Sequence, residues 1–139
     1  MKRFGPSRRE DQRGQAAIEF ALTIGFLVIL LVSMLEMTIF LYNYAVLTDA
    51  AKEGVRYAIV HGASRTPASS TQDVINTVKA FAAASLHSTS GMTVNVNYAT
   101  DDNPGSEVDV NVSYNYQPLF LTTWPNITIS ANSAGRIMF

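Results

Sequence analysis

The sequence GQAAIEFALTIGFLVILLVSMLEMTIFL, residues 14–41, decides the fold of this chain. From Phe20 to Leu35 it has no charged residue and no proline, and eleven of its residues are Leu, Ile, Phe or Val. Crossing a bilayer core about 30 Å thick takes about 20 residues of helix, which residues 20–41 supply. The eleven side chains favour insertion by roughly 3 to 7 kcal/mol, more than the roughly 2.5 to 3.5 kcal/mol that Glu36 would cost at mid-span. The stretch predicts a membrane-spanning helix rather than the core helix of a soluble domain.

The residues before this stretch carry an excess of positive charge. Residues 1–13 contain five basic and two acidic side chains, a net charge of +3 in a chain whose formal net charge is −1. Basic residues beside a span are held on the cytoplasmic side, so residues after about 42 are predicted to lie outside the cytoplasm. The Gly-Pro pair and the many charges predict disorder in residues 1–13. The basic patch is short and has Phe4 as its one aromatic neighbour, so nucleic-acid binding is not predicted.

Beyond Leu41 the apolar pattern narrows but continues with spacings of three and four to about Val60. This period predicts that one amphipathic helix extends the span. The apolar stripe ends in three small residues, Ala51, Gly54 and Ala58, which permit another element to approach closely. We therefore assign them, together with Glu19 and Glu36, to packing against other subunits.

The rest of the chain predicts one helix followed by three strands. A second helix is expected from Thr71 to about Ser88, with Ser69 and Gln72 as a capping box. Three segments then alternate apolar and polar residues, the pattern of an antiparallel sheet with one covered and one wet face. The residues expected on the covered face are Val94, Val96, Tyr98, Val108, Val110, Val112, Tyr114, Tyr116, Ile127, Ile129 and Ala131. Leu119, Phe120, Leu121 and Trp124 fall in the loop before the last strand, which either tucks under the sheet or meets a partner.

Two local patterns suggest a family. Arg13-Gly14 followed by Gln15, Glu19 and Phe20 resembles the prepilin peptidase site of type IV pilin-like proteins, in which cleavage follows a glycine and a glutamate comes five residues later. The resemblance implies cleavage between Gly14 and Gln15 on the cytoplasmic face, with the apolar helix kept by the mature protein. From the residues alone, Glu19 is equally well explained as an acidic side chain that favours the start of a helix.

The second pattern is AAKEGVRYA, residues 50–58. It resembles the segment that follows the membrane helix in TadE-like proteins of tight adherence (Flp) pilus systems. With Gly14, Glu19, Phe20 and Glu36, this resemblance covers about residues 13–61. It implies three kinds of partner besides the membrane: a prepilin peptidase, the inner-membrane pilus assembly platform and other pilin-like subunits.

The sequence offers no convergent set of catalytic groups. Cysteine is absent, so neither disulfides nor thiolate metal sites are available. The two histidines, His61 and His87, do not have the spacing of a metal-binding motif. The run from Asp101 to Glu107 has oxygens enough for calcium, but its glycine is one place early for an EF-hand loop. Asp, Asn, Pro and Gly are ordinary turn residues, so a plain loop is expected there. We predict no enzyme, no metal and no cofactor.

These observations predict an α+β fold, in which a long N-terminal transmembrane helix extends into a small domain with a second helix and a three-stranded antiparallel sheet. Residues 1–14 would be a cytoplasmic basic leader, 15–61 the transmembrane and amphipathic helix, and 62–139 an extracytoplasmic domain. The predicted protein is a single-pass minor pilin-like (pseudopilin) subunit of the bacterial inner membrane, matured by prepilin peptidase. The alternative is an uncleaved, membrane-anchored binding module that recognises a ligand outside the cytoplasm.

Overall fold

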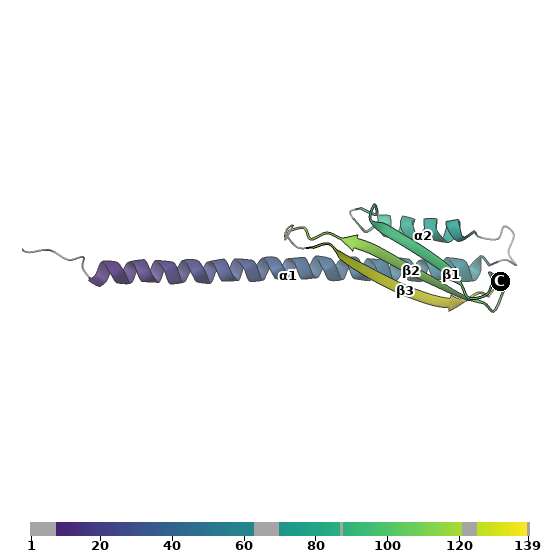
Figure 1. Cartoon of the computed structure of the whole chain (residues 1–139), viewed down its shortest axis with the longest axis horizontal. Coiled ribbons are helices and arrows are strands. Elements are labelled where there is room, and N and C mark those ends of the chain that lie inside the picture. Colours follow the sequence, from purple (N-terminus) through teal and green to yellow (C-terminus); the bar gives the residue numbers. More distant parts are fainter. Residues whose placement is uncertain (1–7, 63–69, 87, 121–124, 139) are drawn as a thin grey trace, which may run out of the picture. The chain divides into compact units, whose positions relative to one another are not determined.

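A computed structural model describes residues 8–62, 70–86, 88–120 and 125–138. Its elements are α1 (Arg8–Val60), α2 (Thr71–Ala83), β1 (Met92–Tyr98), β2 (Glu107–Tyr116) and β3 (Ile127–Arg136) (Figure 1). The chain divides into two compact units, Met1–Met37 and Thr38–Phe139. The α+β fold predicted from the sequence is confirmed.

Helix α1 is 53 residues long and begins at Arg8. Disorder was expected as far as Arg13, so the expectation fails for residues 8–13. Arg, Glu and Gln, which make up most of this segment, are good helix formers, and an apolar helix directly downstream removes the cost of nucleating a new one. The end of α1 at Val60 is where the amphipathic pattern placed it.

The sheet has the order β1-β2-β3, and both neighbouring pairs are antiparallel (Figure 1). Its register sets Val94 opposite Val112 and Val112 opposite Ala131, so one row of the covered face crosses all three strands. All three side chains in this row are buried. The period-two alternation therefore predicted the three strands and most of their covered face. Ile127, at the end of β3, was expected on that face but is 39% exposed.

The core of the second unit joins the C-terminal part of α1 to α2 and the covered face of the sheet. Its largest fully buried side chains come from all three sources; they are Leu47, Val74, Val78, Val108, Val110 and Val112. Burying a Val or Leu side chain contributes roughly 1.5 to 3 kcal/mol, so without disulfides this cluster is the main source of the unit's stability.

Helix α2 begins with a capping box one residue later than predicted, at Ser70 and Asp73 instead of Ser69 and Gln72. The Asp73 backbone N–H donates to the Ser70 hydroxyl (3.2 Å), and the Ser70 backbone N–H donates to the Asp73 carboxylate (2.8 Å). The hydrogen bonds from the Ser70 backbone and side chain lower the pKa of Asp73. An aspartate at this position fulfils the same role as the usual Glu or Gln.

Helix α2 also ends earlier than the predicted Ser88, at Ala83. The next N–H groups turn back onto the last carbonyls: those of Ser85 and Leu86 both donate to the Ala82 oxygen (3.0 and 2.8 Å). This tight turn brings Leu86 back into the core, where it is 7% exposed. Burying Leu86 in the core thus stabilises the chain more than further turns of α2 would.

Gly54 is the position of closest approach in the core, and we expect Gly54→Val to destabilise the second unit. A Cβ built at Gly54 would lie 2.4 Å from Cγ2 of Val78 and 3.3 Å from Cγ1 of Val110. Overpacking of this kind costs about 1 to 3 kcal/mol, and valine is stiff, so neither neighbour can rotate away cheaply. Thermal unfolding of the purified protein in detergent measures the loss. Gly25→Val is the matched control, because nothing lies within 4 Å of a Cβ there; equal melting temperatures for the two variants would contradict the packing argument.

Candidate functional site

The four predicted leader-site residues, Gly14, Gln15, Glu19 and Phe20, lie within α1 in the first unit, and all four are exposed. Glu19 accepts a hydrogen bond from the side-chain amide of Gln15, with Nε2 and Oε1 3.2 Å apart. This i, i+4 contact sets both side chains on one face of the helix. Among the described residues, nothing lies within 4 Å of a Cβ built at Gly14, so none of their contacts requires glycine there.

The side chains that follow Glu19 are exposed from Phe20 to Leu31. Phe20, Leu22, Phe26 and Ile29 are 65 to 69% exposed. In the part of the chain that is described, α1 is the one helix long and apolar enough to cross a bilayer, and its most apolar window is 6% buried. A core helix of a soluble protein would be covered by its own chain, so this helix is consistent with single-pass membrane anchoring.

The residues assigned to subunit packing fall into two groups. Ala51, Gly54 and Ala58 are buried within the second unit, where α2 and β2 approach α1 at Gly54. Their small size therefore serves close packing inside the chain. Glu36 is 7% exposed, the one buried charged side chain among the described residues, whereas Glu19 is exposed. Of the five, Glu19 is the residue whose functional group is open to a second chain.

The Asp101 loop is held together by its own hydrogen bonds. The Asp101 carboxylate accepts from the Ser106 hydroxyl (2.7 Å), the Asn103 backbone N–H (3.2 Å) and the Asn103 side-chain amide. These contacts, that with Ser106 foremost, lower the pKa of Asp101. The oxygens considered for calcium are thus the acceptors that shape a turn. No group of three or more metal-ligating side chains gathers within the described ranges.

His61 packs against the last turn of α1. The Nδ1 atom of His61 lies 3.0 Å from the Tyr57 carbonyl oxygen, and its ring stacks on that of Tyr57 with centroids 4.2 Å apart. It therefore closes the C-terminal turn of α1. His87, Leu121 and Trp124 lie outside the described residues.

Sequence reasoning missed a groove in the second unit. It has a volume of 480 Å³ and is lined by residues of α1, the turn after α2, and the end of β2 with the segment that follows; they are Ile39, Tyr42, Asn43, Ser85, Tyr114, Tyr116, Gln117 and Leu119. One signal was present in the sequence: Tyr42 and Tyr44 directly follow the apolar stretch, and tyrosine is enriched where membrane spans end.

Comparison with known proteins finds one family. Residues 14–56 match the family model described as TadE-like protein. No curated protein matches the chain. No solved structure matches it either. The matched range contains the candidate leader site, the apolar stretch and most of the AAKEGVRYA segment, which confirms the resemblance. Residues 14–56 are thus similar to the TadE-like family, pilin-like structural proteins without known catalytic activity that are associated with tight adherence pilus assembly.

Proposed function

We propose that this protein is a minor pilin-like (pseudopilin) subunit in the assembly of a tight adherence pilus or a related secretion apparatus, and that a prepilin peptidase matures it. One observation carries the proposal: Gly14 and Glu19 are both exposed, and they lie where the apolar stretch of α1 begins. Both residues fall within the range that matches the TadE-like family model. Its proposed partners are the peptidase, the inner-membrane assembly platform and other pilin-like subunits.

Cleavage after Gly14 requires the helix to open there, because a peptidase draws its substrate into the active site as extended chain. Gly14 lies six residues inside α1, whose N–H groups bond four residues back. Glycine in a helix interior is less stable than alanine by about 1 kcal/mol. Gly14 therefore marks the weakest point of this first part of the helix. It also lets the backbone approach the enzyme without a Cβ.

One observation favours the alternative, an uncleaved single-pass binding module. Helix α1 continues unbroken from Arg8 through Gly14, so the bond after Gly14 is not presented as extended chain in the isolated protein. The helix would then be a permanent anchor, and the protein's binding function would reside in the second unit.

The mass of the protein from a membrane fraction decides between the two. We expect a chain that begins at Gln15 and retains the helix and the second unit, because peptidase action removes residues 1–14 only. Expression in a host without a prepilin peptidase is the control and should give the intact chain. An intact chain in the native host would contradict maturation by the peptidase and would favour the uncleaved binding module.

The same proposal predicts the orientation of the chain. Five basic residues precede Gly14 and none lies between Gln15 and Val46, so the second unit should be outside the cytoplasm. Alkaline phosphatase, which is active only after export, should be active when fused after Phe139. A matched fusion after Arg13, ahead of the apolar stretch, should be inactive. A well-expressed but inactive fusion at Phe139 would contradict this orientation.

A further inference from the structure

The groove of the second unit has walls fixed by contacts between distant parts of the chain. The Tyr42 hydroxyl of α1 donates to the backbone oxygen of Ser85, at 3.3 Å. The ring of Phe40 meets that of Tyr116 edge to face, with centroids 5.6 Å apart. These contacts tie residues 39–43 of α1 to the turn after α2 and to the end of β2. The groove is therefore part of the folded unit.

Its surface combines two kinds of side chain. Ile39, Leu119 and the faces of the tyrosine rings are apolar, whereas Asn43, Ser85 and Gln117 bring polar groups to the same lining. Leu119 is 64% exposed and the next residue, Phe120, is 51% exposed. Large apolar side chains that the folded chain leaves exposed beside a groove indicate a surface that binds an apolar partner.

The depth of the groove relative to a bilayer follows from the length of the apolar stretch. Residues 20–41 make up about 33 Å of helix at 1.5 Å per residue, close to the roughly 30 Å of a hydrocarbon core. Tyr42 is the next residue, so Ile39 to Asn43 lie where acyl chains meet headgroups. Ser85 and Tyr116 contact this same part of α1, so they would lie at the same depth relative to the bilayer.

We infer that this groove binds a glycerophospholipid of the membrane that α1 crosses. The acyl chain would lie along Ile39 and Leu119, with Phe120 beside it in the interface. The amides of Asn43 and Gln117 would donate to ester or phosphate oxygens. The described residues of the lining are uncharged, so the recognition proposed here rests on the acyl chain and the ester region. Continuity with the exposed apolar stretch of α1 favours lipid over a second protein chain.

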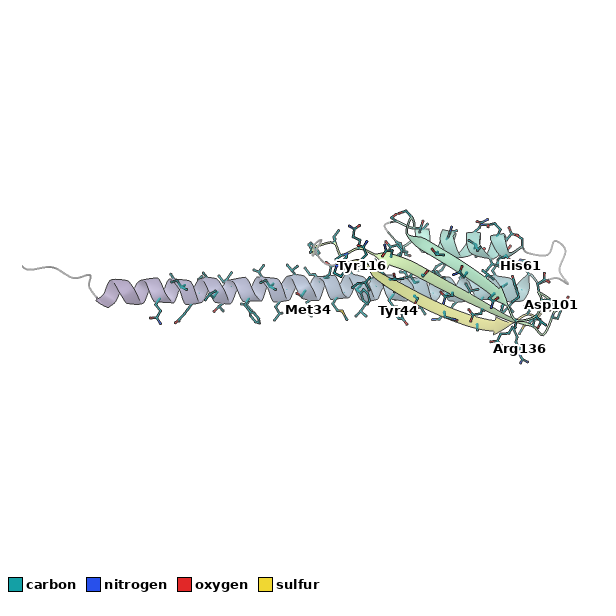
Figure 2. All side chains as sticks on the ribbon, viewed as in Figure 1. Met34, Tyr44, His61, Asp101, Tyr116 and Arg136 are labelled. Carbon is teal, nitrogen blue, oxygen red and sulfur yellow. The ribbon has the colours of Figure 1, made fainter. Side chains whose placement is uncertain are left out.

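Fluorescent labelling tests the lipid site, because the protein has no cysteine and any introduced one is unique. Leu119→Cys and Phe120→Cys carry an environment-sensitive fluorophore in vesicles of phosphatidylcholine, with or without lipids bearing a nitroxide near the top of the acyl chain. We expect blue-shifted emission and at least about two-fold quenching by the nitroxide lipid at both positions. Figure 2 shows Tyr116 at one end of the sheet and Arg136 at the other. Label at Arg136→Cys, an exposed position, should therefore emit as in water and stay unquenched.

A third label, at Phe26→Cys inside the apolar stretch, separates the lipid site from anchoring itself. Quenching at Phe26 without quenching at Leu119 and Phe120 would overturn the lipid site and leave the anchor intact. No quenching at any position would overturn both. The measurement is repeated at about one protein per vesicle. Emission that is blue-shifted only at high protein density, without quenching, would assign the groove to a second copy of this chain instead of lipid.

Discussion

A Gly14→Val variant is expected to accumulate in the membrane fraction as the full-length chain, with no product that begins at Gln15. The peptidase must draw the backbone at residue 14 into a narrow site in extended form, and a branched side chain would clash there. Valine also removes the flexibility that helps α1 to open at this position. We expect the loss of cleavage to be at least about 100-fold, as read from intact and mature masses in the native host.

The surroundings of Gly14 make this result interpretable. A Cβ at Gly14 has no described residue within 4 Å, and Gly14 lies outside the second unit, so valine there should leave the packing of the second unit unchanged. Gly25→Val places the same substitution farther along the same helix, also in open space, and should be cleaved normally. A chain beginning at Gln15 in the Gly14→Val variant would show that the leader site lies elsewhere.

The sequence predicted those parts of the fold that follow from periodicity. Alternation placed Val94, Val112 and Ala131 on one face of the sheet, and the three-four spacing carried α1 to Val60. Apart from Ile127, which was expected on the covered face and is exposed, the errors lie at helix ends, where a few residues compete for the same capping position. Ser69 and Ser70 can both begin a helix, and the structure selects Ser70 because Asp73 lies in range to return the hydrogen bond.

The candidate site was harder to predict, because a pattern shows what a surface permits and not what occupies it. The small residues Ala51, Gly54 and Ala58 indicated close packing and were assigned to contacts with other subunits, whereas the structure shows α2 and β2 of the same chain packed at Gly54. The groove depends on Tyr42 meeting Ser85, 43 residues away, which no local pattern encodes. Glu19 was singled out from its place five residues after Gly14, and within the chain it accepts a hydrogen bond from Gln15.

Glu19→Gln is expected to be cleaved and inserted normally but to lose co-purification with its pilin-like partners. In the single chain Glu19 is exposed and accepts a hydrogen bond from the Gln15 side-chain amide, 3.2 Å away. An exposed i, i+4 pair contributes only about 0.2 to 0.5 kcal/mol, too little to govern assembly. Cleavage would create a new cationic group, the amino terminus of Gln15. Between packed helices an unpaired carboxylate costs several kcal/mol, so Glu19 would need such an amine from a neighbouring subunit.

Pairing between chains fixes the axial register of one subunit against the next, because the amine and the carboxylate lie at defined positions on each helix. Replacing the carboxylate with an amide removes the charge while keeping the side chain's size and its contact with Gln15.

Glu36→Gln is the matched control. Glu36 is 7% exposed in its own chain, so its loss should reduce co-purification less than the loss of Glu19. Both variants are isolated through a tag on the subunit, and the amount of co-purified pilin-like protein is compared with wild type. Intact complexes in Glu19→Gln would mean that Glu19 acts only within its own chain, near the helix N-terminus that cleavage creates at Gln15, where the helix dipole favours an acidic side chain.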